Sequence, residues 1–170
     1  MKVLNLFAYT GGATLAAAAA GASVTHVDAS KGMVTWAKEN AVASGLGDAP
    51  IRWLVDDCVK FVEREIRRRN HYDAIIMDPP SYGRGPKGEI WKIEDCIHDL
   101  IKLCTKILSD EPLFFLINSY TTGLAPAVLT YMLSTELKKF GGHVDSQEIG
   151  LPVSSNGLVL PCGASGRWEA

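Results

Sequence analysis

The first 21 residues of the chain read MKVLNLFAYTGGATLAAAAAG. Residues 3–8 form a short apolar run, which is typical of a β-strand buried on both faces. Gly11 and Gly12 follow this run, and the alanine-rich residues 13–20 predict a helix that ends at Gly21. The stretch therefore predicts a strand, a glycine-rich turn and a helix, which is the repeating unit of a parallel sheet.

The same alternation continues along the rest of the chain. Further apolar runs predict strands at residues 23–27, 51–55, 72–77 and 113–117. Helical spacing of apolar side chains predicts helices at residues 31–44, 59–69, 93–108 and 126–137. Two strand-like runs, residues 144–151 and 158–160, predict a closing antiparallel hairpin. We expect an α/β fold: a doubly wound, mostly parallel seven-stranded sheet with helices on both faces and a C-terminal hairpin.

The composition limits the class of protein. Of the 170 residues, 47% are hydrophobic and 21% charged, which is typical of one globular domain. The chain has no run of about 18 apolar residues and its start lacks a basic signal region, so we expect no membrane contact and a cytoplasmic location. The net charge of −2 does not indicate a nucleic-acid binder, so such a role requires a local patch or another domain. The four cysteines form no C-x-x-C pair, which favours buried thiols over disulfides, and we expect no metal.

Ligands of such sheets bind beyond the carboxyl ends of the strands, where this sequence places polar residues. Tyr9 and Thr10 precede the two glycines after the first strand, and glycine lets the backbone approach a ligand. The G-x-G-x-x-G spacing that seats a pyrophosphate is absent, which favours a ligand without phosphate and disfavours a nicotinamide-dependent oxidoreductase. Asp28 follows the second strand, where an acidic side chain accepts hydrogen bonds from ribose hydroxyls or caps the next helix.

Two acidic residues, Asp56 and Asp57, follow the third strand. A carboxylate in this position can accept a hydrogen bond from an adenine amino group, or it can cap the helix that follows. We assign the first role to Asp57 and the second to Asp56, although the sequence leaves the choice between them open.

The sharpest signal is Asp78-Pro79-Pro80, at the end of the fourth strand. The prolines stiffen the turn and leave carbonyl oxygens without local partners, so these oxygens and the Asp78 carboxylate can converge on one N–H donor of an acceptor. Tyr82 can stack on a planar substrate, and Asn118 ends the fifth strand, where it would line the same cleft.

At these residues the chain resembles the class I S-adenosylmethionine-dependent methyltransferases, which have a Rossmann-like fold, and more narrowly the bacterial ribosomal-RNA methyltransferases of the large subunit. The resemblance is carried by VLNLFAYTGG at residues 3–12, VDASK at 27–31, AKEN at 37–40, Asp56-Asp57, and MDPPSYG at 77–83. It implies S-adenosylmethionine as cofactor. The implied cofactor-binding residues are Phe7, Ala8, Tyr9, Thr10, Gly11 and Gly12 for the methionine part, Asp28, Ala29 and Ser30 for the ribose, Asp56, Asp57 and Cys58 for the adenine, and Asp78.

The resemblance also implies an RNA acceptor, held by Asp78, Pro79, Pro80, Tyr82 and Asn118. Relatives that make 5-methylcytosine carry a catalytic cysteine after the fifth strand, where this chain has Asn-Ser-Tyr at residues 118–120. We therefore expect N-methylation of a base in ribosomal RNA. The alternatives are a methyltransferase acting on DNA, protein or a small molecule, and a non-catalytic S-adenosylmethionine-binding domain.

Two further expectations concern recruitment of the substrate. Family members carry an N-terminal substrate-binding region, so the resemblance implies that residues 1–170 form a catalytic domain without it. Basic residues around the acceptor loop, namely Arg84, Lys87 and Lys92, are then expected to supply the RNA contacts of this domain, which makes RNA binding weak and dependent on salt.

Overall fold

The computed structural model describes residues 1–170 and contains a seven-stranded sheet. The strands of this sheet are β1 (Lys2–Leu6), β2 (Ser23–Asp28), β3 (Ile51–Val55), β4 (Ala74–Met77), β7 (Phe114–Ser119), β8 (His143–Pro152) and β9 (Val159–Glu169). Their order is β3-β2-β1-β4-β7-β9-β8, and only β9 runs antiparallel to the others. The expected mostly parallel, seven-stranded fold is confirmed.

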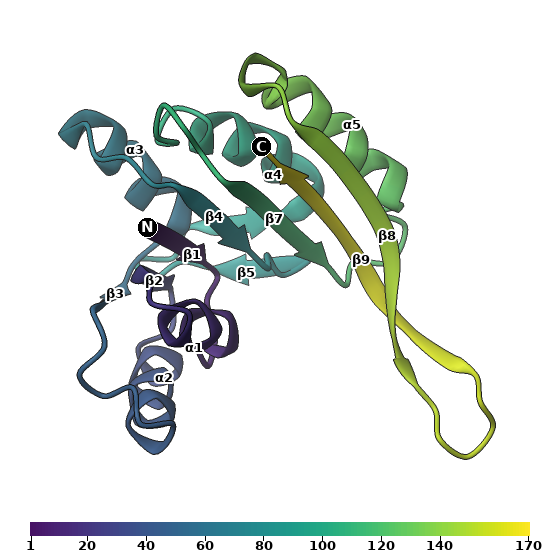
Figure 1. Cartoon of the computed structure of the whole chain (residues 1–170), viewed down its shortest axis with the longest axis horizontal. Helices are drawn as coiled ribbons and strands as arrows, with labels where there is room; N and C mark the ends of the chain where they lie inside the picture. The colour runs from purple at the N-terminus through teal and green to yellow at the C-terminus, as the bar shows by residue number, and fades with distance from the viewer.

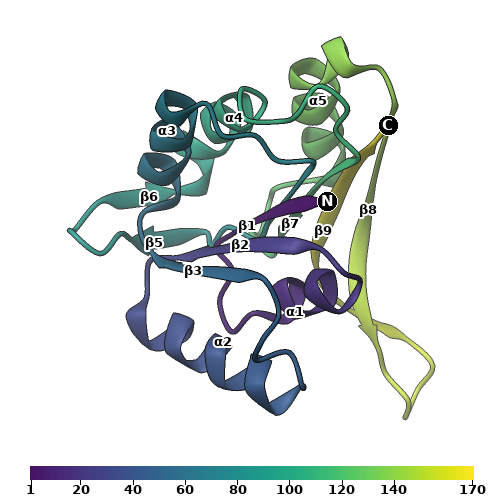
Figure 2. The same cartoon turned by 60° about the vertical axis from the view of Figure 1, so that its left-hand side comes forward.

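Five α-helices cover the two faces of the sheet. They are α1 (Gly12–Ala19), α2 (Lys31–Ala43), α3 (Cys58–Arg68), α4 (Ile93–Cys104) and α5 (Pro126–Glu136), and a short 3-10 helix, Lys138–Phe140, follows α5. Figures 1 and 2 show α1 and α2 on one face and α3, α4 and α5 on the other. The larger core, a cluster of 25 buried residues, lies under the second group, and a cluster of six lies under α1. None of the helices is long and apolar enough to cross a membrane.

The C-terminal hairpin is longer than the sequence predicts. Strand β9 inserts between β7 and β8, and the far end of the hairpin extends beyond the body of the domain (Figure 1). The pairing of Asn118 with Ser165 and of Ser119 with Ala164 prolongs β7 by two residues past its predicted end. Helix α4, in contrast, ends at Cys104, before its predicted end at residue 108.

Residues 81–89 are expected to form a loop because they follow the Asp-Pro-Pro turn and contain three glycines, but part of this segment is strand. Strands β5 (Tyr82–Arg84) and β6 (Ile90–Lys92) pair antiparallel as a separate two-stranded sheet. The hairpin closes because Gly85 N–H donates to the Glu89 carbonyl at 2.8 Å and Gly88 takes a φ of 87°, which glycine adopts without strain. All four cysteines are free thiols. Cys58 and Cys104 are buried as expected, whereas Cys96 is half-buried and Cys162 is exposed, so the expectation of buried thiols is wrong at these two positions.

Candidate active site

A cavity of about 620 Å³ lies at the carboxyl ends of the central parallel strands. Polar residues after β1, β2, β3 and β4 meet there because parallel strands end at the same edge of a sheet. The 14 lining residues are Phe7, Tyr9, Asp28, Ala29, Ser30, Asp57, Cys58, Asp78, Pro80, Gly83, Arg84, Gly85, Trp91 and Tyr120. Nine of these are among the site residues that the sequence predicts.

The turn after β1 is held in an unusual backbone conformation. Phe7 and Tyr9 have φ values of 54° and 48°, a region that non-glycine residues rarely occupy. The Asp28 carboxylate holds this turn, because it accepts hydrogen bonds from the Tyr9 and Ser30 N–H groups, both at 2.8 Å. Asp28 thus joins the ends of β1 and β2, and its remaining lone pairs are available to a ligand in the cavity.

Four predicted cofactor-binding residues of this turn, Ala8, Thr10, Gly11 and Gly12, do not line the cavity. Gly11 is required for packing, because it has a φ of 88° and an added Cβ would lie 3.1 Å from the Ala37 Cβ. Gly11 therefore shapes the turn rather than lining the cavity.

A buried polar network under the turn was not predicted from the sequence. The Asn5 amide donates to the Thr14 hydroxyl at 2.9 Å, and that hydroxyl lies 2.9 Å from His26 Nδ1. Burial lowers the pKa of His26 to about 4, so this imidazole is neutral at neutral pH. Asn5 and His26 lie in predicted buried strands, and Thr14 lies in the first turn of the predicted first helix. Their polar side chains in these segments were the one indication of the network that the sequence offered.

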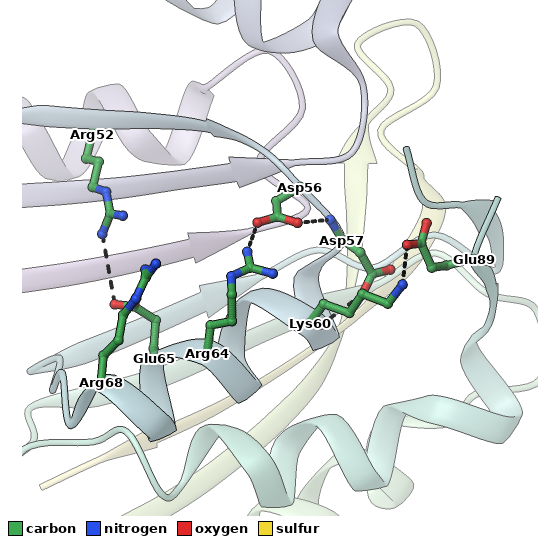
Figure 3. A network of polar contacts seen from close by, with 8 residues as sticks. All are labelled: Arg52, Asp56, Asp57, Lys60, Arg64, Glu65, Arg68 and Glu89. Carbon is green, nitrogen blue, oxygen red and sulfur yellow. Dashed lines mark hydrogen bonds and ion pairs between the residues drawn. The ribbon is translucent and has the colours of Figure 1, made fainter. Parts of the chain in front are cut away.

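Asp56 and Asp57 have different contacts (Figure 3). Asp57 is the N-cap of α3: its carboxylate accepts a hydrogen bond from Lys60 N–H at 2.9 Å, and it also lines the cavity. Asp56 accepts from Asp57 N–H at 2.9 Å, pairs with Arg64, and does not line the cavity. The interpretation of Asp56 as the helix cap is wrong, because α3 begins at Cys58, immediately after Asp57.

Cys58 connects the third strand end to the first. Its Sγ accepts a hydrogen bond from the Phe7 N–H at 3.4 Å, which ties the β1 turn to the start of α3. Burial raises the pKa of this thiol well above its usual range. A buried thiol that stays protonated is a poor nucleophile, so Cys58 has the properties of a structural residue in the cavity wall.

Asp78 forms the opposite side of the cavity. Its side chain is accessible through the cavity, yet the surrounding protein displaces enough water to raise the pKa of the carboxyl above its usual range. Pro80 lines the cavity, whereas Pro79 is buried behind it. The Pro80 carbonyl has no local partner, as expected, but it is not free for an acceptor, because it accepts a hydrogen bond from the distant Trp91 Nε1 at 2.7 Å.

Two predicted acceptor residues besides Pro79 lie outside the cavity lining. Tyr82 is exposed on β5, and Asn118 is half-buried within β7, which extends to Ser119. Tyr120, the first residue after β7, lines the cavity in place of Asn118. Ser119 is buried and its hydroxyl accepts from Thr121 N–H at 3.1 Å.

The hairpin β5–β6 supplies four further wall residues that were not among the predicted cofactor or acceptor residues. Gly83, Arg84, Gly85 and Trp91 line the cavity, and a Lys60–Glu89 ion pair joins the hairpin to α3 (Figure 3). Each strand has only three residues, too few for a periodic pattern to reveal it.

The fold and the site agree with the class I methyltransferases that the sequence resembles: an acidic residue ends β2, another follows β3, and an Asp-Pro-Pro turn follows β4. A family model of S-adenosylmethionine-dependent methyltransferases matches residues 1–131. The chain belongs to the S-adenosylmethionine-dependent methyltransferase family, and the resemblance predicted from its motifs is confirmed.

Individual relatives agree with this family. A ribosomal RNA large subunit methyltransferase K/L from Shewanella frigidimarina (strain NCIMB 400) is 36% identical over 110 residues, which are 64% of this chain and 15% of that protein. The structure of a SAM-dependent methyltransferase from Agrobacterium tumefaciens superimposes with a TM-score of 0.95 at 43% identity, over 99% of this chain and 56% of that chain. A methyltransferase from Streptococcus mutans shares the fold, with a TM-score of 0.80 at 23% identity, over 99% of this chain and 44% of that chain. The chain thus spans only a small part of its curated relative.

S-adenosylmethionine is the cofactor of this family, and the cavity fits it. The lining carries three carboxylates, Asp28, Asp57 and Asp78, against one guanidinium, Arg84. Such a lining favours a ligand with positive charge, as on a sulfonium and an ammonium group, over a pyrophosphate. The cavity volume is within the usual range for small-molecule sites.

Proposed function

We propose that this domain transfers a methyl group from S-adenosylmethionine to a nitrogen atom of a base in large-subunit ribosomal RNA. The observation that carries the proposal is one cavity with two unlike sides: Asp28 and Asp57 face it from β2 and β3, and the Asp78-Pro79-Pro80 turn faces it from β4. The RNA acceptor is supported by the name of the Shewanella relative.

On the donor side, we assign Asp28 to the two ribose hydroxyls and Asp57 to the adenine amino group. The Asp28 carboxylate accepts hydrogen bonds from two backbone N–H groups and the Asp57 carboxylate from one, which fixes their orientation before the donor binds. Phe7 and Tyr9 form the wall beside the methionine part. The bound donor supplies an electrophilic methyl group on a sulfonium centre. We leave Asp56 out of the donor site, because Arg64 occupies its carboxylate.

On the acceptor side, Asp78 in its ionised form accepts a hydrogen bond from an N–H of the base. The stiff Pro-Pro turn limits where that carboxylate can point, so it aligns the nitrogen lone pair with the methyl group. Tyr120 lines the cavity and is 58% exposed, so its ring is available to stack on the base. We assign Tyr120 the stacking role that the sequence suggested for Tyr82.

Nitrogen is favoured over ring carbon because carbon methylation of cytosine needs a thiolate that adds to the ring. Cys58 is the sole cysteine in the cavity wall, and its buried, hydrogen-bonded thiol has a raised pKa. A nitrogen lone pair attacks the methyl group directly: the N–C bond forms as the S–C bond breaks, S-adenosylhomocysteine leaves, and the nitrogen gives up its N–H proton to water. Positioning then supplies most of the rate acceleration.

Contacts to RNA phosphates are proposed for Arg84, Lys87 and Lys92. All three are exposed on or beside the β5–β6 hairpin, and Arg84 also lines the cavity. Three cations support weak binding, so tight recruitment requires a further RNA-binding region, as the family resemblance implies. A ribosomal RNA acceptor also agrees with the cytoplasmic location that the sequence predicts.

The proposal is tested by transfer of a radioactive methyl group to unmodified large-subunit ribosomal RNA made by transcription, followed by nucleoside analysis. We expect label in an N-methylated base. Label in a 5-methylpyrimidine would refute the assignment to nitrogen. Calorimetric binding of S-adenosylhomocysteine without transfer to RNA, DNA or protein would instead indicate a small-molecule methyltransferase or a non-catalytic binding domain.

A further inference from the structure

Trp91 connects the two sides of the cavity. It lies on β6, is 6% exposed, and is one of the lining residues. Its ring centroid is 4.8 Å from that of Phe7 in the donor-side turn, and its Nε1 donates a hydrogen bond to the Pro80 carbonyl at 2.7 Å. One side chain thus contacts both the turn after β1 and the turn after β4.

The turn at residues 78–81, called the acceptor turn below, needs hydrogen-bond donors from other segments of the chain. Pro79 and Pro80 have no N–H groups, so no backbone donor of theirs can fix the turn. Three contacts hold the turn: Trp91 Nε1 donates to the Pro80 carbonyl, Ile93 N–H donates to the Ser81 carbonyl at 3.0 Å, and the Ser81 hydroxyl lies 2.7 Å from that of Thr121. Two of these three contacts come from β6 and the start of α4, so this segment is the main support of the turn that carries Asp78.

The remaining anchor of the hairpin is weaker. Lys60 and Glu89 form an ion pair between α3 and the hairpin (Figure 3), and the Lys60 side chain is half exposed. Ion pairs at the surface contribute little because water and salt screen them. Trp91 has instead a large buried aromatic surface and a short hydrogen bond, and we infer that it dominates the placement of the hairpin.

We propose that Trp91 is a positioning residue for methyl transfer, which sets the acceptor turn relative to the donor turn through the Pro80 carbonyl and the Phe7 ring. The inference rests on the proposed function. Trp91 touches neither reacting atom; it acts through Asp78. A displacement of about 1 Å at a reacting centre can lower a rate about a hundredfold, so loss of this hydrogen bond lowers transfer more than it lowers donor affinity.

The chain offers a matched control in Trp168. Its Nε1 donates to the Gly141 carbonyl at 2.7 Å, its ring centroid is 6.0 Å from that of Phe140, and it is 1% exposed. It lies on β9 and does not line the cavity. Trp91→Phe and Trp168→Phe therefore each remove one hydrogen bond from a buried indole N–H to a backbone carbonyl, and each leaves an aromatic ring in place.

We would measure the melting temperature, the calorimetric Kd for S-adenosylhomocysteine, and the kcat for transfer to unmodified large-subunit ribosomal RNA. Both variants are expected to melt at a lower temperature and to bind the product within about threefold of wild type. The kcat is expected to fall by about tenfold or more only in Trp91→Phe. Equal kcat values in the two variants would overturn the inference. A wild-type protein without RNA transfer would instead overturn the proposed function.

A second measurement needs no variant. Amide hydrogen exchange of wild-type protein is followed at Gly85 and Ile93 with and without S-adenosylhomocysteine. Because Trp91 links the hairpin to Phe7, we expect bound product to slow exchange at both amides. Unchanged exchange at both amides, with the product bound, would contradict the coupling of the hairpin to Phe7 through Trp91. This result would count even if Trp91→Phe did not fold or if no acceptor were found.

Discussion

Replacement of Asp28 tests the donor site most directly. In the structure its carboxylate accepts hydrogen bonds from Tyr9 N–H and Ser30 N–H, both at 2.8 Å. A carboxylate has about four acceptor positions, so about two remain for the ribose hydroxyls. Asn keeps the size of the side chain but has one acceptor oxygen, which cannot serve both backbone N–H groups and both hydroxyls.

The expected loss follows from these counts. A hydrogen bond to a charged group contributes about 1.5 to 3 kcal/mol, and the opening of the site to solvent reduces this value. We therefore expect Asp28→Asn to weaken donor binding by about 1 to 3 kcal/mol, which is roughly 5- to 150-fold in Kd. Some of the loss arises from the turn itself, because Tyr9 has a positive φ and loses the partner that holds it.

The assay is calorimetric titration of S-adenosylhomocysteine into folded protein, with thermal unfolding measured on the same samples. Asp56→Asn is the matched control, because Asp56 also follows a strand but binds Arg64 outside the cavity. We expect its Kd to stay within about twofold of wild type. An unchanged Kd in Asp28→Asn, or equal losses in the two variants, would refute the donor assignment.

Four further predictions concern the acceptor side. Asp78→Asn is expected to lower transfer at least about a hundredfold and to leave the product Kd within about threefold; equal loss of both would place Asp78 on the donor side. The pKa of Asp78 is raised, so the folded protein binds the carboxyl proton more tightly than the unfolded chain does. Ionisation of Asp78 therefore lowers the free energy of unfolding at pH values above the raised pKa. At pH values below the usual aspartate pKa the carboxyl is protonated in both states, and this effect is absent. Asp78→Asn should therefore melt no lower than wild type at pH 7, and wild-type transfer should decline as the pH falls through the raised pKa. A substrate with 5-fluorocytosine should give no stable covalent complex, and a complex that disappears in Cys58→Ala would show that the nitrogen assignment is wrong. RNA affinity of this chain, resting on Arg84, Lys87 and Lys92, should fall about 20-fold between about 50 and 200 mM salt, and tight binding insensitive to salt would contradict it.

The order of elements could be predicted from the sequence because each signal is local. Strands buried on both faces are largely apolar, as residues 74–77 are throughout and residues 3–6 are apart from Asn5, and the helices between them follow from spacing and from glycine stops. The edge at which the ligand binds also follows, because parallel strands all end on one side. Asp28, Asp57 and Asp78 were found in this way, and all three line one cavity.

Contacts between distant segments decided the finer features of the site. Strand β9 pairs with Asn118 and Ser119 and lengthens β7, so the residue that reaches the cavity is Tyr120. No local pattern at residues 118–120 carries that information, because the partner strand lies more than 40 residues later in the chain.

The sequence by itself thus determined the α/β architecture, the family and the acidic residues at the strand ends. Periodicity, turn chemistry and parallel topology are properties of short segments, which one chain displays without its tertiary contacts. Only the tertiary structure decided that Asp57 both caps α3 and lines the cavity, and that residues 82–92 fold back as a hairpin over it. The role of Trp91 also depends on tertiary structure. Its partner Phe7 is distant in the sequence and its partner Pro80 belongs to a different turn, so only the packing of the folded chain brings the three residues together.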